Sequence, residues 1–180
     1  MPPRRKITSK KQYSKKQREY SSLLIIECDA NKLQSQSINI AQIINKIFSI
    51  LPLIKHRFIQ LYSKEDLLSK FAELSKEKQE YDIIILVGHS ILDPSGNPVK
   101  IKFASDYSIR WNILPSFLRD FKSKCLILAT CKGGHFLPSR EMFDGLPTLI
   151  ELFGSPVITN QKQISILKFI ILYLIATSKF

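Results

Sequence analysis

Short, continuous apolar runs separated by stretches of helical periodicity are the dominant pattern of this chain. Runs of this kind are typical of strands buried on both faces of a parallel sheet. They predict strands at 22–29, 57–62, 81–89, 124–131 and 154–159. Apolar residues between the runs recur at the spacing of one helix face, which predicts helices. These helices are expected at 40–51, 63–74, 111–121, 146–153 and 164–177, with Ser37 and Ser63 as the caps of the first two.

The alternation of strands and helices predicts the fold class. Right-handed crossovers between buried parallel strands place helices on both faces of the sheet. We therefore expect an α/β fold, a three-layer α-β-α sandwich with a mainly parallel, doubly wound sheet, over residues 21–180. A small hairpin, with arms near 99–103 and 107–110, is expected in the long segment after the third strand.

The last predicted helix is apolar on nearly all sides. Its longest uninterrupted apolar run, 169–176, is much shorter than the roughly 20 residues that span a bilayer. We expect no membrane span. Helices of this kind are usually covered on most sides, so a partner chain or a homo-oligomer contact through this helix is a reasonable expectation.

Positive charge is concentrated at the N-terminus. The chain carries 27 Lys and Arg against 15 Asp and Glu, a net charge of +12. Residues 1–20 hold eight of the basic residues and only Glu19 on the acidic side. The charges are not followed by the apolar h-region of a signal peptide, so the arm does not resemble a secretory signal. We expect a disordered arm, either merely solvated or in weak contact with nucleic acid or another anionic partner through residues 4–18.

The number of cysteines indicates whether the protein resides in an oxidising or a reducing compartment. Three Cys in 180 residues form no disulfide framework, and the number is odd. This favours a reducing, cytoplasmic location.

Polar residues whose side chains could bind a ligand or take part in catalysis follow the predicted strands. Because ligands of open α/β sheets bind outside the carboxyl ends of the strands, Asp29, His89, Cys131 and residues 159–161 are expected at one rim. His89 and Cys131 each end a buried strand, so adjacent strands would bring them together. A Cys nucleophile needs a partner that exchanges protons near neutral pH, and His is the usual one.

The residues around this pair could complete such a site. Backbone N–H groups of Ser90, Lys132 and Gly133 are candidates to hold an oxyanion, and Lys132 could also favour a thiolate. The alternative is structural: Cys131 is then a small buried hydrophobe and His89 a hydrogen-bonded rim residue.

The two blocks resemble a known superfamily. An apolar strand ending in Gly-His89 and a later strand ending in Ala-Thr-Cys131-Lys-Gly-Gly are similar to the His and Cys blocks of caspase-like proteases, closest to the bacterial CHAT type. The resemblance implies a peptide substrate, His89 as general acid–base, Cys131 as nucleophile, and neither metal nor other cofactor. It also implies substrate-pocket roles for Asp29, Asn160 and Lys162.

Two departures leave two functions open. Ser90 stands where the superfamily usually has Gly, and residues 160–163 lack the acidic residue often found there. Lys162 would favour an acidic or neutral residue at the cleavage site. The leading hypothesis is a cysteine endopeptidase. The alternative is an inactive caspase-like module whose basic arm binds a partner or nucleic acid.

Other motifs are weaker. Gly88-His-Ser-Ile-Leu92 lacks the last Gly of a serine-hydrolase elbow. The sequence has no Cys-x-x-Cys pair that would indicate a zinc site, and it has no Gly-rich loop that would indicate a nucleotide site. His135 is an alternative base.

Overall fold

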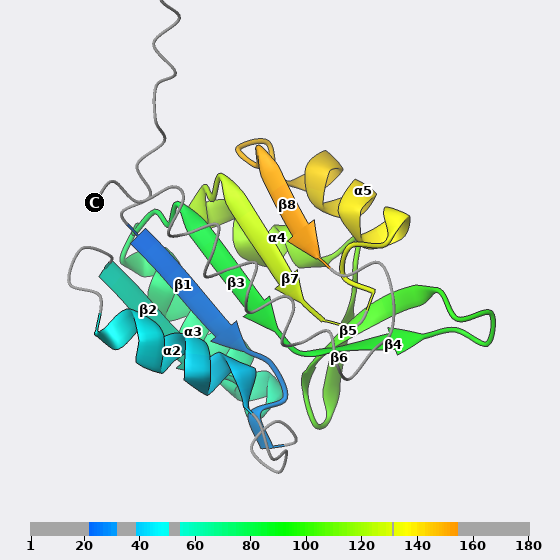
Figure 1. The fold of residues 1–180 in the computed structure, drawn as a ribbon, viewed down its shortest axis with the longest axis horizontal. Helices are drawn as coiled ribbons and strands as arrows, with labels where there is room; N and C mark the ends of the chain where they lie inside the picture. The colour runs from blue at the N-terminus through cyan, green and yellow to red at the C-terminus, as the bar shows by residue number, and fades with distance from the viewer. Residues whose placement is uncertain (1–21, 32–38, 51–54, 131, 155–180) are drawn as a thin grey trace, which may run out of the picture.

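A five-stranded parallel sheet forms the centre of the protein. A computed structural model describes residues 22–31, 39–50, 55–130 and 132–154. The strands run in the spatial order β2-β1-β3-β7-β8, all parallel (Figure 1). Their bounds are β1 Ser22–Glu27, β2 Lys55–Gln60, β3 Ile83–Val87, β7 Cys125–Ala129 and β8 Glu151–Gly154. The prediction of an α/β fold with a mainly parallel sheet is confirmed.

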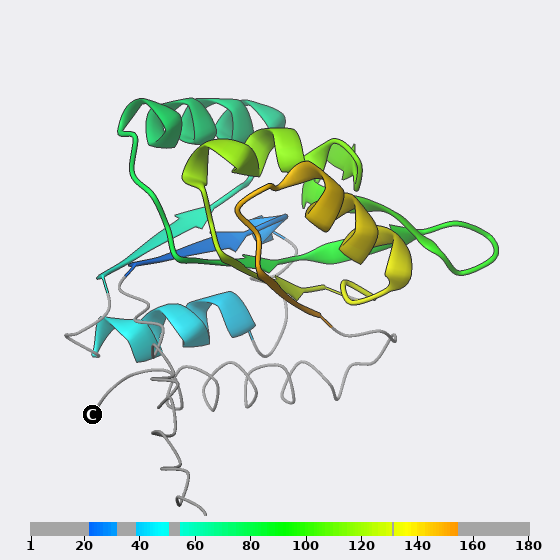
Figure 2. The same ribbon diagram turned by 90° about the horizontal axis from the view of Figure 1, so that it is seen from above.

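Helices lie on both faces of this sheet. Their bounds are α2 Ile40–Ser49, α3 Lys64–Lys76, α4 Leu114–Leu118 with the 3-10 turn η1 Arg119–Phe121, and α5 Phe136–Gly145. Figure 2 shows α2 on one side and α3, α4 and α5 on the other. Alternate residues of a strand point to opposite faces, so Leu23 and Ile25 pack with α2 while Leu24 and Ile26 join the core under α3 and α4. This layering is compatible with a three-layer sandwich.

The winding of the chain reverses between β1 and β3. The chain passes from β1 to β2 at one edge, and then returns to pair β3 with the other side of β1. Loops after two such strands leave a crevice at their carboxyl ends, the usual place for ligands in open α/β sheets. Cys28 and Gly88 follow β1 and β3 at this point.

A second, antiparallel sheet projects from the end of β3. It contains β4 His89–Leu92, β5 Pro98–Ala104 and β6 Tyr107–Arg110 in that spatial order. The expected hairpin is present as β5 and β6, but β4 adds a third strand in a segment predicted as loop. Ile101, Phe103 and Ile109 bury one face of this sheet in the main core. Between Ile91 and Leu92 the register shifts, so that β5 bulges at Val99.

The segment after β7 differs most from prediction. The helix expected at 146–153 is wrong: α5 lies earlier, at Phe136–Gly145, and β8 begins at Glu151. Pairing of Leu152 and Phe153 with β7 places these apolar residues in the sheet instead of on a helix face. Pro138 obscures α5 in the sequence, but it lies in the first turn, where backbone N–H groups need no helical partner.

One of the two predicted helix caps is confirmed. Ser63 Oγ accepts the N–H of Asp66 at 3.1 Å, at the start of α3. The prediction of Ser37 for α2 is wrong, because the cap is Asn39, whose Oδ1 accepts the N–H of Gln42 at 3.1 Å. Asn39 also donates its amide to Glu27 Oε1 at 2.6 Å, which ties the helix start to the end of β1.

Several predictions concern residues outside the described ranges. These are the arm at 1–20 with its contacts through 4–18, the helix at 164–177 with its proposed interface, and Cys131, Asn160 and Lys162. Of the helices within the described ranges, none is long and apolar enough to cross a membrane.

Candidate functional site

The strands β3 and β7 are adjacent and parallel, as predicted. Val87 lies opposite Ala129, and the pairing continues past the strand ends, where Gly88 N–H donates to the Ala129 carbonyl at 3.3 Å. The chain therefore leaves both strands at the same level of one rim. His89 is the second residue after Val87, and position 131 is the second after Ala129.

His89 is half-buried and is the first residue of β4, not the last residue of β3 as predicted. Gly88 separates the two strands and allows the chain to pass close to β1. A Cβ at Gly88 would lie 2.9 Å from Cys28 Cβ, closer than real Cβ contacts come. Lys102 of β5 lies opposite His89 in the antiparallel register. The imidazole thus stands where the two sheets join.

Asp29 lies beside this junction in a buried ion pair. Its side chain is 1 % exposed, and Lys102 Nζ lies 3.4 Å from Oδ2. The backbone adopts a left-handed φ of 53°, and its N–H donates to the Phe103 carbonyl at 2.7 Å. The predicted substrate-pocket carboxylate is therefore already matched by a cation of this chain. Sequence reasoning missed Lys102, although the alternation of polar and apolar residues along β5 would have placed it on the outer face.

Ser90 contacts the end of β7 through its side chain. Its hydroxyl donates to Thr130 Oγ1 at 3.2 Å, and Thr130 is buried. The bond links β4 to the loop that follows β7, across 40 residues of sequence. The sequence predicts that Thr130 points to the other side of the strand from Cys131, but nothing local indicates its bond to Ser90.

Lys132 holds the same loop against the small sheet. Its backbone adopts a φ of 54°, and its ammonium donates to the carbonyl of Gly96 in the β4–β5 turn. In the same turn, Asp93 Oδ1 accepts the N–H of Asn97 at 2.7 Å. This bond is the main reason that the pKa of Asp93 is lowered. The Lys132 ammonium is thus engaged with the turn.

The Gly133–Gly134 pair permits a turn too tight for other residues. Gly133 N–H donates to the Thr130 carbonyl at 3.2 Å. A Cβ at Gly133 would lie 2.7 Å from Leu128 Cβ, and one at Gly134 would overlap the Gly154 carbonyl of β8. His135 follows as the N-cap of α5, where its Nδ1 accepts the Leu137 N–H at 3.4 Å. The alternative base therefore has a structural role here.

The other two cysteines are fully buried on opposite faces of the sheet. Neither of these two cysteines forms a disulfide. Burial raises the pKa of the Cys28 thiol well above its usual range, and the negative charges of Asp29 and Glu27 raise it further. Because the thiolate is the reactive form, Cys28 is expected to be inert at neutral pH.

We predict that iodoacetamide at neutral pH alkylates Cys131 at least about tenfold faster than Cys28 or Cys125 in the folded protein. Mass spectrometry of peptides after timed quenching measures the three rates. The same reaction in denaturant is the control, because unfolding should bring the three rates together. Equal rates in the folded protein would contradict the assignment of Cys131 as the reactive thiol.

No group of metal-ligating side chains gathers at this rim or elsewhere in the described ranges. The chain matches no family model and no curated protein. The candidate site therefore rests on the rim itself, which brings Asp29, His89, Ser90, Lys132 and Gly133 to one edge of the sheet.

Proposed function

We propose that this protein is a cysteine endopeptidase of caspase-like type, with Cys131 as nucleophile and His89 as general acid–base. The observation that supports it best is the register of β3 and β7. Val87 and Ala129 are partners, so the residues two positions further along each chain start from the same level of the rim. A Cys–His dyad requires two side chains within reach of one substrate carbonyl, and adjacent parallel strands that end at the same level support that arrangement.

In the proposed reaction, His89 takes the thiol proton of Cys131, and the thiolate sulfur attacks the carbonyl carbon of a peptide bond to form a tetrahedral oxyanion. His89 gives a proton to the leaving amine, which leaves an acyl-enzyme. The imidazole then takes a proton from water as the water attacks the acyl carbonyl, and the thiol is released. Backbone N–H groups of Ser90, Lys132 and Gly133 are the candidate oxyanion donors.

The charges at the rim favour a substrate without a basic side chain at the cleavage site. A buried carboxylate such as Asp29 could hold a Lys or Arg of the substrate, but Lys102 already pairs with it at 3.4 Å. A basic side chain would have to displace this cation. We propose an acidic or neutral residue there, in agreement with the roles suggested for Asn160 and Lys162.

One observation favours the second candidate, an inactive interaction module. The Ser90 hydroxyl is bonded to Thr130, and the Lys132 ammonium is bonded to Gly96. The Lys132 ammonium, which was expected to favour a thiolate, is thus engaged within the protein, and the Ser90 hydroxyl ties β4 to the loop after β7. The basic arm at 4–18 would then supply the contact with a partner or nucleic acid.

Cleavage of a peptide library separates the two candidates. The proposal expects products from the wild type and none from Cys131→Ala or His89→Ala, with His135→Ala as the matched histidine control that retains activity. Acidic or neutral residues should dominate on the amino side of the cleaved bonds. Absence of cleavage by the wild type over a broad range of pH and peptide sequences would favour the module.

A further inference from the structure

Two side-chain hydrogen bonds join the loop after β7 to the small antiparallel sheet, one on each side of Cys131 in the sequence. Before this position, Thr130 Oγ1 accepts a hydrogen bond from the Ser90 hydroxyl at 3.2 Å. After it, the Lys132 ammonium donates to the Gly96 carbonyl in the β4–β5 turn. The loop is therefore held against β4 and the turn that follows β4.

Backbone pairing alone does not set the distance between the two chains at this level. Gly88 N–H donates to the Ala129 carbonyl at 3.3 Å, where both chains still follow the parallel sheet. Beyond this bond, β4 leaves that sheet and pairs with β5 instead. The separation of the residues that follow therefore depends on side-chain contacts as well.

The bond between Ser90 and Thr130 connects the immediate neighbours of the proposed dyad. Ser90 directly follows His89, and Thr130 directly precedes Cys131. His89 lies opposite Lys102 in the small sheet, and Ser90, the next residue of β4, points to the other face. The bond thus holds the start of β4 without occupying the face that carries the imidazole.

The hydroxyl of Thr130 is enclosed by its surroundings. The residue is 3 % exposed, and a Cβ at Gly133 would lie 2.7 Å from its Oγ1. Ser90 lies opposite Ile101, which is fully buried in the main core. Because a hydroxyl buried without a partner is costly, each of the two side chains favours the position in which it meets the other.

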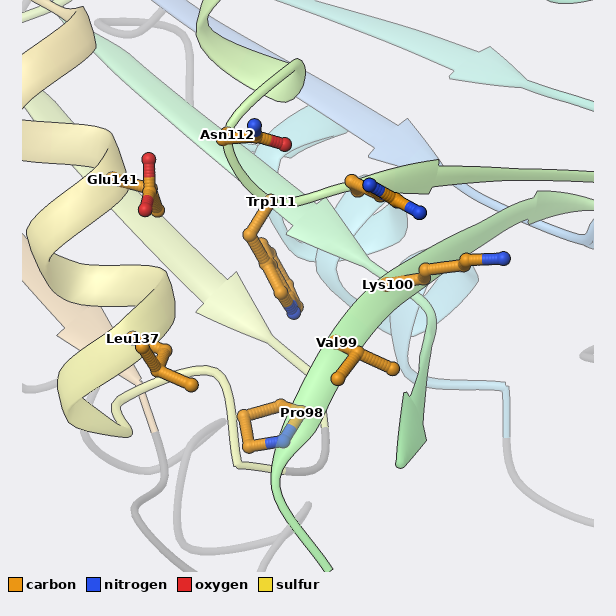
Figure 3. A pocket seen from close by; sticks show the side chains of 8 residues that line it. Pro98, Val99, Lys100, Trp111, Asn112, Leu137 and Glu141 are labelled. Carbon is orange, nitrogen blue, oxygen red and sulfur yellow. The ribbon is translucent and has the colours of Figure 1, made fainter. Parts of the chain in front are cut away.

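The small sheet has less support on the side of α5. A cavity of about 410 Å³ lies between β5 and α5. Figure 3 shows Pro98 and Val99 on one side of this cavity and Leu137 of α5 on the other. Because the small sheet is not closely packed against α5 there, its hydrogen bonds to the loop after β7 contribute more to its position.

We propose that Ser90 and Thr130 are positioning residues, whose bond sets the distance between the His89 imidazole and the Cys131 sulfur. This role rests on the function proposed above. Proton transfer between the two groups requires a separation within hydrogen-bond reach, and a displacement of about 1 Å can lower a rate about a hundredfold. The caspase-like proteases that the sequence resembles usually have Gly at position 90, and Gly could not form this bond.

Alkylation of Cys131 by iodoacetamide at neutral pH, measured on the full chain, tests this role. Because the imidazole takes the thiol proton in the proposed dyad, its displacement should slow the reaction. Ser90→Ala and Thr130→Val should each lower the rate at least about fivefold. Thr130→Ser keeps the hydroxyl and should stay within about twofold of the wild type. Ser108→Ala, which removes a half-buried hydroxyl of β6 in the same small sheet, is the matched control and should leave the rate unchanged.

The same substitutions in a His89→Ala variant separate positioning from a general effect on the loop. Without the imidazole, Ser90→Ala and Thr130→Val should each lower the alkylation rate by no more than about twofold. A merely structural effect on the loop would lower the rate by the same factor in both backgrounds. Urea unfolding checks that each variant is folded under the assay conditions. The two substitutions remove opposite ends of one bond, so either of them is sufficient for the test.

Three outcomes would overturn the positioning role. If wild-type Cys131 reacts fast and depends on His89, but removal of either hydroxyl leaves its rate unchanged, the dyad does not need this bond. Equal losses in the two backgrounds would mean that the bond supports only the loop. If wild-type Cys131 reacts no faster than Cys125, or if His89→Ala leaves its rate unchanged, the proposed function itself fails, and the positioning role fails with it.

Discussion

Substitution of Cys131 by Ala is expected to abolish peptide cleavage and to leave the free energy of unfolding nearly unchanged. Without the sulfur no acyl-enzyme forms, and loss of a nucleophile lowers turnover by a factor on the order of 10⁴ or more. In the sequence, the residue is the second after Ala129, the last residue of β7, and so it does not belong to the buried part of that strand. We therefore expect a change in stability of about 1 kcal/mol or less. Cleavage assays and urea unfolding measure the two effects.

Cys125→Ala is the matched control and should show the opposite pattern. Cys125 begins β7, is fully buried and belongs to the core on the α2 side. Its truncation should cost about 1–2 kcal/mol, because surrounding atoms cannot fully close the space, while cleavage persists. If Cys131→Ala destabilises the protein as much as Cys125→Ala and cleavage continues, Cys131 is a packing residue and the proposed dyad is wrong.

Gly134→Ala is expected to destabilise the protein by about 2–3 kcal/mol and to reduce cleavage as well. A Cβ at Gly134 would overlap the carbonyl of Gly154, and would lie 3.2 Å from its Cα. These are backbone atoms of β8, which cannot rotate away as a side chain could. Relief requires the loop to move off the edge of the sheet, which would also displace the residues that follow β7. Urea unfolding with a parallel cleavage assay measures both effects.

Gly96→Asn is the control. Glycine is favoured at position 96 by the positive backbone φ, and not by a lack of space for a Cβ atom. Gly96 has a φ of 80°, and among the described residues the only atom that an added Cβ would meet within 4 Å is Lys132 Nζ, at 3.5 Å. Asn tolerates a left-handed backbone, so the cost should stay below about 1 kcal/mol. An unfolding free energy of Gly134→Ala equal to that of the wild type would show that the loop and β8 do not pack as closely as described.

The sequence was sufficient to predict a parallel sheet, but it placed the fifth strand at 154–159, whereas β8 is Glu151–Gly154, and it did not predict the second sheet in full. Strands such as Ile83–Val87 are buried on both faces, and their side chains are all apolar for that reason. β4 could not be recognised in this way, because all four of its residues are only partly buried and its partner lies further along the chain. The prediction of a helix at 146–153 was wrong for a related reason. The apolar residues of this segment fit a helix face, but pairing with β7 places Leu152 and Phe153 in the sheet.

For the candidate site, the sequence alone determined which residues follow the buried strands and therefore share a rim. That inference needs the continuous apolar runs, which are local, and the parallel direction of the strands, which follows from the alternation of strands and helices along the chain. The tertiary structure decided what each residue meets there. Lys102 reaches Asp29, Ser90 reaches Thr130, and Lys132 reaches the Gly96 carbonyl. Such contacts depend on strand order, on register and on where β5 crosses the end of β1, and these follow from packing of the whole chain and not from local sequence.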